Sequence, residues 1–507
     1  MFSKHPKGLI GAALSNMGER FGFYIMMAIL LLFLNNKFGF TGAEGSIIYS
    51  VFYALIYVLS LAGGLIADRT KKYKSTIVCG LILMSLGYLL LAVPTKTPVE
   101  NMPLILFFTC FGLLAIAFGN GLFKGNLQAV VGQLYDNPEY SDKRETGFQI
   151  FYMFINVGAM FAPLMAVGLR NWWVQSNGYR FNADLPGLCN QYISGDITAE
   201  ATERFTRLAT EVGNTSGDLA AFAKDYLNVF MEGYHYSFGI AIIAMLISLV
   251  IFIANKRTLP DPAAKVVKKA ADAKSVEMDA AEIKQRLYAL FAVFAVVIFF
   301  WFSFHQNGQT LTLFADEYTQ LLKLDLGFTS IEGAEVFQTF NPFFVVFLTP
   351  IIIGLFGWLK AKGIELSTPK KIGIGMGIAA MAFAVMAIGS TGLYDYNERV
   401  SMGGLDDTMR VTPWLLIGTY LILTVAELFI SPLGIAFVSK VAPPQYQGIM
   451  QGCWLSATAI GNQLLFIGVI FYKSIPIWAT WCVFVAACLV SMFTMLAMLK
   501  WLERVAK

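Results

Sequence analysis

Five ionisable side chains lie inside long apolar runs of this 507-residue chain: Glu19, Arg20, Lys124, His305 and Glu427. An ionisable group inside a membrane-spanning segment costs roughly 2.5–3.5 kcal/mol on insertion scales, so such groups usually face a cavity or a partner. Residues of these types can bind a charged solute or carry protons, and each is therefore a candidate site residue.

Glu19 and Arg20 are adjacent, and neighbours on a helix point about 100° apart, so we expect each to find its partner on another helix. Lys124 is the expected partner of Glu19. The alternative is a static structural ion pair. Because a buried static pair is often no more stable than apolar packing, we favour a pair that breaks and re-forms as the protein changes conformation.

Glu427 and His305 lack an obvious counter-charge. No cation lies in the apolar run around Glu427, so its carboxyl group is expected either to be protonated or to bind a cationic ligand. An unperturbed imidazole titrates at about 6.5, and burial moves that value, so His305 is a second candidate for carrying a proton. A neutral, hydrogen-bonded His305 is the alternative.

The composition shows what surrounds these groups. Hydrophobic residues make up 57% of the chain and charged residues 14%, whereas a soluble protein carries about 25% charged residues. This excludes a water-soluble enzyme, a nucleic-acid-binding protein and a disordered chain. The net charge of +4 indicates no polyanionic partner, and the 6 cysteines and 3 histidines show no disulfide framework and no metal-ligand spacing. We therefore expect a large polytopic membrane protein with no bound metal.

Twelve runs are long and apolar enough to cross a bilayer as helices, which takes roughly 20 residues each. They cover residues 9–35, 46–68, 75–94, 103–133, 145–169, 232–255, 286–317, 334–359, 371–393, 412–440, 447–472 and 475–502. An even number of spans puts both termini on one side. Lys and Arg gather after spans two, four, six and eight and at the C-terminus. The positive-inside rule therefore predicts cytoplasmic termini in a multi-pass protein of the cell (inner) membrane.

The spans divide into two sets of six. Residues 1–255 are predicted to form an N-terminal six-helix bundle with an outer loop at 170–231. That loop contains two helix-like stretches, 199–212 and 218–230. The basic segment 256–285 is the predicted cytoplasmic linker, and residues 286–507 are the predicted C-terminal six-helix bundle. The expected fold is an all-α membrane protein with 12 transmembrane helices in two bundles, which is the layout of the major facilitator superfamily.

The segment Gly64-Leu65-Ile66-Ala67-Asp68-Arg69-Thr70-Lys71-Lys72 supports this layout. It resembles the G-x-x-x-D-R-x-x-[KR] signature of that superfamily, in which an aspartate at a helix end can latch the two halves. Asp68 and Arg69 are therefore predicted gate or latch residues, and the alternative is an ordinary helix end with stop-transfer cations. In folds of this type the substrate lies near mid-membrane, and the halves rock to open alternate sides.

Several blocks spread over the chain resemble motifs of the proton-dependent oligopeptide transporter (POT) family. They are Glu19-Arg20-Phe21-Gly22-Phe23-Tyr24 in span one, Gly119-Asn120-Gly121-Leu122-Phe123-Lys124-Gly125-Asn126 in span four, Phe151-Tyr152-Met153-Phe154-Ile155-Asn156-Val157-Gly158 in span five, Phe340-Asn341-Pro342 in span eight, Ala426-Glu427-Leu428 in span ten and Gly452-Cys453-Trp454 in span eleven. The blocks occur in family order over nearly the whole chain, so together they are specific.

The resemblance implies eight substrate-binding residues: Arg20, Tyr24, Tyr57, Lys124, Asn156, Asn341, Glu427 and Trp454. In such transporters the two basic residues help to hold the peptide carboxylate or relay protons, and the glutamate holds the peptide amino terminus. The asparagines bind backbone amides or the amine, and the aromatic residues line the pocket. Helix packing is the alternative for the aromatic residues, and interhelical hydrogen bonding is the alternative for the asparagines.

Three positions depart from the family pattern. Asn16 replaces the first motif glutamate, Met27 replaces a later arginine of span one, and His305 replaces a glutamate of span seven. In relatives that arginine and that glutamate can pair across the two halves, and here both charges are absent together. We therefore expect proton coupling to depend on Glu19, Lys124 and His305, and a changed substrate is an alternative.

The leading hypothesis is a proton-coupled symporter that imports di- and tripeptides by alternating access and is not an enzyme. Protons are the expected coupling ion, with no other cofactor. Small peptides, protons and the lipid bilayer are the expected partners, with no nucleic acid, and the protein is expected to act as a monomer. The runner-up is transport of another small anionic or zwitterionic solute, such as nitrate or an amino acid derivative. A membrane sensor that binds but does not transport is the hypothesis from another class.

Overall fold

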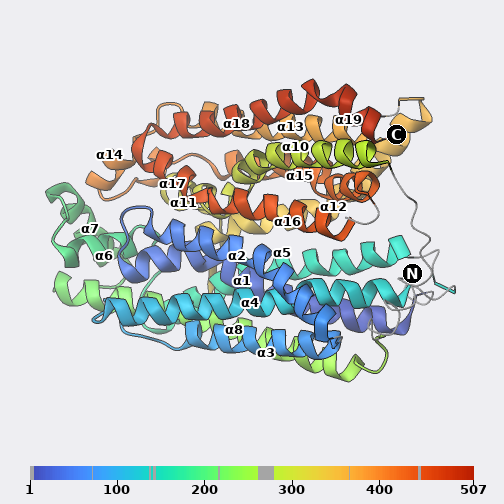
Figure 1. The fold of residues 1–507 in the computed structure, drawn as a ribbon. Coiled ribbons are helices and arrows are strands. Elements are labelled where there is room, and N and C mark those ends of the chain that lie inside the picture. The colour runs from blue at the N-terminus through green and yellow to red at the C-terminus, as the bar shows by residue number, and fades with distance from the viewer. Residues whose placement is uncertain are drawn as a thin grey trace.

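The computed structural model describes residues 5–70, 72–135, 139–140, 144–214, 217–260, 279–364, 366–443 and 447–506. These residues contain 12 helices that are long and apolar enough to cross a membrane, which confirms the predicted number of spans. Figure 1 shows the helices side by side in two layers, with the helices of the first half of the chain in one layer and those of the second half in the other. Both termini lie at the same end of the molecule (Figure 1), here called the terminal end. The opposite end, which carries α6, α7 and α14, is called the loop end.

The described helices of the first half pack around α1, which contacts both α5 and α8 and has few exposed residues. Their bounds are α1 Lys7–Phe38, α2 Glu44–Thr70, α3 Tyr73–Ala92, α4 Met102–Leu134, α5 Arg144–Ser176, α6 Leu185–Ser194, α7 Ala199–Val212 and α8 Leu219–Asn255. Helices α6 and α7 lie outside the apolar spans and form a small cap at the loop end (Figure 1).

The second half is helical except for one short hairpin. Its described elements are α10 Ala280–Phe304, η3 His305–Gly308, α11 Thr310–Tyr318, β1 Lys323–Asp325, β2 Ser330–Glu332, η4 Ala334–Thr339, α12 Phe340–Ala361, α13 Thr368–Gly389, α14 Tyr396–Ser401, η5 Asp407–Met409, α15 Pro413–Val441, α16 Gln447–Gln463, α17 Leu465–Ser474, α18 Ile477–Ala497 and α19 Leu499–Val505. Strands β1 and β2 pair antiparallel at the loop end. This hairpin is a small departure from the all-α prediction.

The stretch 218–230 is helical as predicted, but its assignment to an outer loop separate from span six is wrong, because it is the first part of α8. Asp218 caps the helix by accepting hydrogen bonds from the backbone nitrogens of Ala220 and Ala221, each at 3.0 Å. Phe222, Tyr226, Phe230 and Tyr234 then follow one another every four residues and form a continuous row of ring contacts. Residues four apart lie on one helix face, so this row carries the helix from the loop end into the apolar span without a break. The predicted stretch 199–212 coincides with α7.

Span seven is broken, although its sequence predicted one continuous helix. Helix α10 ends at Phe304, one 3₁₀ turn follows, and α11 resumes at Thr310. At the break, a Cβ on Gly308 would lie 2.3 Å from the Tyr49 hydroxyl oxygen of α2, so a larger residue would force the Tyr49 side chain to shift. The amide Nε2 of Gln309 donates to the Ser50 Oγ of α2 at 2.9 Å. The break is therefore held against the first half.

A seam of glycines brings α2 and α4 into backbone contact. A Cβ on Gly63 would lie 2.1 Å from the Gly121 carbonyl oxygen, and a Cβ on Gly121 would lie 2.4 Å from the Leu59 carbonyl oxygen. Small residues allow such close packing between membrane helices. The seam sets Lys124 of α4 beside Tyr57 of α2, and both face the centre of the molecule.

The predicted linker 256–285 lies largely outside the described residues, since 261–278 are not among them. The bundle boundaries at residues 255 and 286 stay predictions.

Candidate binding site

A cavity of about 380 Å³ lies between the two halves of the chain. It is lined by all eight of the predicted substrate-binding residues: Arg20, Tyr24, Tyr57, Lys124 and Asn156 from the first half, and Asn341, Glu427 and Trp454 from the second. Ligand pockets typically measure about 300–1,000 Å³, so this cavity can enclose only a small ligand. The structure thus brings together residues from seven spans, and their binding roles stay predictions.

Lys124 is the basic residue of the cavity that has no acidic partner within the described part of the chain. Its Nζ lies 5.3 Å from the centre of the Tyr57 ring, close enough for a cation–π contact. Its side chain is only half-buried and lines the cavity. The charge is therefore held in place by an aromatic ring and left open to an anionic group of a ligand.

Glu427 is the acidic residue on the other side of the cavity. Its Oε2 accepts a hydrogen bond from Asn341 Nδ2 at 2.9 Å, and the same amide nitrogen donates to Thr424 Oγ1 at 3.1 Å. Neither partner is charged, and no ion pair reaches this carboxylate among the described residues. Asn341 therefore orients the carboxylate without neutralising it, and a cationic group of a ligand could do so.

The predicted separation of Glu19 and Arg20 is wrong, and so is the predicted Glu19–Lys124 pair. Arg20 Nε and Nη2 each donate to a carboxylate oxygen of Glu19 at 2.6 Å, and the two side chains are 5% and 0% exposed. Asn120 Nδ2 donates to Glu19 Oε1 at 2.8 Å. Both side chains are long enough to bend toward each other from adjacent positions. A buried carboxylate is stabilised by a nearby guanidinium group, whose planar geometry lets it donate one hydrogen bond to each carboxylate oxygen. The charge of Arg20 is thus already paired.

His305 lies at the break in span seven and is packed between rings. Its ring stacks on Trp301 with centroids 4.8 Å apart and is tilted against Tyr53 at 5.0 Å. Its Nδ1 forms a short hydrogen bond with Asn462 Oδ1. His305 also lines the cavity, so it can present its second ring nitrogen to a ligand or a proton.

Many of the remaining lining residues have aromatic or amide side chains and were not predicted as site residues. They include Tyr49, Tyr53, Tyr152, Gln338 and Tyr420. The tyrosines at 49, 53 and 57 are four residues apart, which is the one signal in the sequence that could have grouped them on one face of α2. Met27 lines the same cavity, so the two substituted positions Met27 and His305 belong to one site.

The predicted latch residues do not contribute to this cavity. The side chain of Asp68 lies outside the described residues, and Arg69 is exposed at the end of α2. Their latch role stays a prediction. Asn16 is buried in α1 and is not among the residues that line the cavity.

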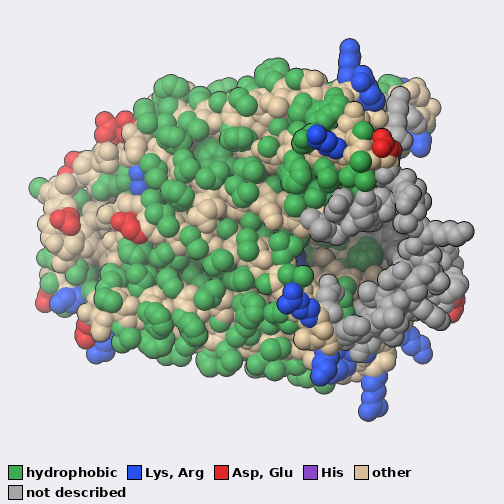
Figure 2. Space-filling view, viewed as in Figure 1, with side chains coloured by type: hydrophobic (Ala, Val, Ile, Leu, Met, Phe, Trp, Pro, Cys, Tyr) green, Lys and Arg blue, Asp and Glu red, His purple; other side chains and the backbone are tan. Residues whose placement is uncertain are grey.

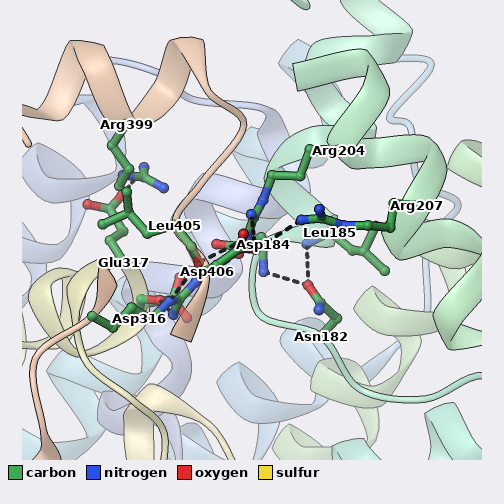
Figure 3. Close-up of polar contacts among 11 residues, drawn as sticks. Asn182, Asp184, Leu185, Arg204, Arg207, Asp316, Glu317, Arg399, Leu405 and Asp406 are labelled. Carbon is green, nitrogen blue, oxygen red and sulfur yellow. Dashed lines mark hydrogen bonds and ion pairs between the residues drawn. The ribbon is translucent and has the colours of Figure 1, made fainter. Parts of the chain in front are cut away.

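A second charged cluster lies at the loop end, where Figure 3 shows arginine and carboxylate side chains of both halves pointing toward one another. Asp184, just before α6, accepts hydrogen bonds from Arg204 of α7 at 3.0 Å and from Arg410 of the second half at 2.8 Å. Arg204 also pairs with Asp406 across the halves at 2.5 Å and donates to the Leu405 carbonyl oxygen at 2.8 Å. Sequence reasoning missed this cluster, because its members are far apart in polar loops.

Asp406 is the most exposed acid of this cluster, with 48% of its side chain exposed. Burial acts to raise its pKa, but the hydrogen bond and charge of Arg204, with the charges of Arg207 and Arg410, outweigh burial. The pKa of Asp406 therefore lies below its ordinary value. Ion pairs this exposed contribute little to stability because water and salt screen them.

A buried ion pair joins the halves beside this cluster. Arg170 Nη1 of α5 lies 2.5 Å from Glu335 Oε1 of η4, and both side chains are 1% exposed. The Tyr234 hydroxyl donates to the same carboxylate oxygen at 2.8 Å. Next to the pair, Asn171 Nδ2 donates to the carbonyl oxygens of Ser330 and Glu332, so strand β2 is tied to α5.

The halves are joined mainly toward the loop end. Among the described residues, most hydrogen bonds and ion pairs between the halves lie there. Beside the cavity, Gln338 Nε2 donates to the Ala28 carbonyl oxygen at 3.3 Å, and Gln309 is bonded to Ser46 and Ser50 of α2. Figure 2 shows a hollow between the two halves toward the terminal end. The cavity is thus closed on the loop-end side.

Comparisons with known proteins agree with this geometry. The family model described as POT family (PTR2) matches residues 74–276 and 261–477. The peptide transporter YePEPT of Yersinia enterocolitica subsp. palearctica is 29% identical over 478 residues, which are 91% of this chain and 87% of that protein. A dipeptide and tripeptide permease B of Xenorhabdus bovienii is 27% identical over 486 residues, which are 90% of this chain and 86% of that protein.

Solved structures share the fold. The crystal structure of a peptide transporter POT in complex with sulfate has a TM-score of 0.71 at 23% identity, covering 100% of this chain and 96% of that one. The crystal structure of a POT family transporter in complex with 5-aminolevulinic acid has a TM-score of 0.70 at 21% identity, covering 100% and 98%. The arrangement of 12 spans is therefore the major facilitator fold.

Proposed function

Since the chain belongs to the POT family of membrane transporters, we propose that it is a proton-coupled symporter that imports di- and tripeptides by alternating access. In this proposal the peptide binds in the central cavity, protons are the coupling ion, and one chain is the functional unit. Relatives named as peptide transporters and as di- and tripeptide permeases support peptides as the substrate.

One observation carries the proposal, which is the placement of Lys124 and Glu427 in one cavity but in opposite halves. A peptide carries a carboxylate at one end and an ammonium group at the other. The carboxylate would pair with Lys124 and the ammonium group with Glu427, and the aromatic walls would accept varied side chains. A ligand bound to both halves couples its own binding to their relative motion, as alternating access requires.

Proton coupling is proposed to use Glu19, Lys124 and His305. A proton on Glu19 would remove the charge that holds Arg20 in its bidentate pair and would free the guanidinium group for the ligand carboxylate. The ammonium group of Lys124, which has no acidic partner among the described residues, would compete with Arg20 for the ligand carboxylate. His305 offers a further proton site in the cavity wall. Proton and peptide would thus bind together, because each favours breaking the Glu19–Arg20 pair.

The orientation follows from the distribution of basic residues. Figure 2 shows Lys and Arg side chains gathered toward the terminal end and acidic ones mainly toward the loop end. The positive-inside rule then places the terminal end in the cytoplasm of the cell (inner) membrane. In that orientation the structure is closed to the outside and hollow toward the cytoplasm, which is the state from which an importer releases its substrate.

Transport of another small zwitterion is the alternative that a specific observation favours. The cavity of about 380 Å³ is small for a ligand site. A structure of similar fold holds 5-aminolevulinic acid, which carries an amine and a carboxylate like a dipeptide but has no peptide bond and no side chains.

Uptake into proteoliposomes tests the proposal. Labelled dialanine should accumulate faster when the side facing the loop end is acidic. Lys124→Ala and Glu427→Gln should each abolish uptake, whereas Lys284→Ala and Glu100→Gln, at exposed positions, should not. Retained uptake in both cavity variants would show that the site is wrong. Competition by 5-aminolevulinic acid, free amino acids or nitrate, with no competition by peptides, would favour the alternative.

A further inference from the structure

The cavity contains one unpaired positive charge and one unpaired negative charge among its described lining residues. Arg20 is neutralised by both carboxylate oxygens of Glu19. Lys124 has only the Tyr57 ring beside its ammonium group, and Glu427 is bonded to the neutral amide of Asn341. A ligand with one carboxylate and one ammonium group would neutralise both charges completely.

While Arg20 stays paired with Glu19, the rest of the described wall has no acidic residue, lysine or arginine that could pair with a third charge. Its other polar side chains include amides and hydroxyls such as those of Gln128, Gln338 and Thr458. Met27 lines the cavity with an apolar side chain that is 5% exposed. His305 is hydrogen-bonded to Asn462 and stacked on Trp301. The other rings of the wall are uncharged phenylalanine, tyrosine and tryptophan side chains from both halves. Burying an ionised group is costly unless an opposite charge or several hydrogen bonds compensate it. In a cavity of about 380 Å³ the side chains of a bound peptide lie against this wall.

We propose that this transporter selects zwitterions that carry no ionised group besides one carboxylate and one ammonium group, so that peptides with acidic or basic side chains are poor ligands. The inference rests on the proposed function, since it places a peptide in the same cavity, but its charge rule holds for any zwitterionic ligand of that site.

Pairs of ligands that differ in charge and hardly in shape test the rule. Affinities of the purified wild-type protein are measured for Ala-Gln against Ala-Glu and for Ala-Met against Ala-Lys. Ala-Glu and Ala-Lys should each bind at least about tenfold more weakly than their neutral partners, which is the factor that about 1.4 kcal/mol of uncompensated charge produces. Equal affinities within each pair, to about twofold, would overturn the proposal.

A gain of affinity sharpens the test. Met27→Arg supplies a cation to the wall, so it should bring the affinity for Ala-Glu close to that for Ala-Gln and leave Ala-Lys weak. Met27→Gln is the matched control, because it adds polarity at the same position without charge and should keep the wild-type ratio of Ala-Gln to Ala-Glu. A ratio that Met27→Gln shifts as much as Met27→Arg would show that charge is not the cause. If Met27→Arg does not fold, the wild-type ligand pairs still decide the proposal.

The same design separates this inference from the proposed function. If no dipeptide binds, the peptide assignment fails, and glutamine against glutamate and methionine against lysine then test the charge rule on free amino acids. A preference for the neutral member in both pairs would uphold the rule for a non-peptide substrate. Equal binding of glutamine and glutamate would overturn it there as well.

Discussion

The protein has charged residues between its halves in two places, and the two places differ in how their charges are paired. At the loop end, Arg170 and Glu335 contact each other while almost wholly buried, and Asp184 holds two arginines. In the central cavity, Lys124 and Glu427 have only neutral partners among the described residues.

This difference in pairing indicates that charged residues have a structural role at the loop end and a proposed ligand-binding role in the cavity. A buried ion pair that loses one partner leaves an uncompensated charge, so the paired charges of the loop end hold one arrangement of the halves. An unpaired charge in an apolar interior is costly, so it persists where a ligand can neutralise it. The paired charges thus hold the loop end closed, and the unpaired charges mark the cavity as the proposed binding site.

The strongest expected effect comes from locking the loop end. The strap, defined as α6 and α7 with the residue Thr198 between them, contacts the second half where Thr198 Oγ1 donates to the Ser401 carbonyl oxygen. Cross-linking Thr198→Cys to Ser401→Cys with a short bifunctional thiol reagent should abolish transport, because the halves could no longer separate at this end. Cleaving the linker should restore it, measured as uptake into proteoliposomes.

A matched cross-link lies within the first half. Asn190 Nδ2 of the strap donates to the Asn36 carbonyl oxygen at 2.9 Å, so Asn36→Cys and Asn190→Cys join the strap to its own half. Transport should survive this cross-link. Full transport by the cross-linked Thr198–Ser401 variant would contradict a loop end that must open.

The next effect is on stability. Arg170→Met should lower the free energy of unfolding by about 3–5 kcal/mol, because Glu335 is left charged and buried without its partner. Arg170→Met combined with Glu335→Leu should recover much of the loss, since neither charge remains. Arg207→Met is the control, because that side chain is 53% exposed and exposed pairs contribute about 1 kcal/mol or less. Thermal unfolding in detergent measures all three, and an undiminished stability of Arg170→Met would refute the role of the pair.

The smallest effect concerns pH at the loop end. The pKa of Asp406 is lowered in the folded protein, so its contribution to stability is present above the ordinary aspartate pKa of about 4 and is lost as the pH falls through the lowered value. Because the group is half exposed, the loss should be about 1 kcal/mol or less. Asp406→Asn should remove this part of the acid sensitivity of unfolding. An identical pH dependence in the variant would contradict the assignment.

The sequence predicted the number of spans because hydropathy over about 20 residues is a local property. It also named residues from seven spans that the structure places in one cavity, since the family motifs carry positions that no local pattern contains. Their roles in binding stay predictions.

Pairing and helix breaks were not predictable in the same way. The bidentate Glu19–Arg20 contact depends on how two flexible side chains bend inside the folded bundle, and helix geometry alone argued against it. The break before Thr310 lies where Tyr49 approaches Gly308 from the other half. The loop-end cluster unites residues such as Asp184 and Arg410, which are more than two hundred positions apart. Each of these features is set by tertiary contacts that one sequence does not display.

The central claim is that Lys124 and Glu427 each bind one charged end of the ligand. A cycle of binding measurements tests it most directly, comparing dialanine with its C-terminal amide in the wild type and in Lys124→Ala. The account predicts that amidation weakens binding to the wild type by about 10- to 100-fold and changes binding to Lys124→Ala little. In the same way, N-acetylation of dialanine should weaken binding to the wild type and change binding to Glu427→Gln little. An amidation penalty of the same size in the wild type and in Lys124→Ala would contradict it.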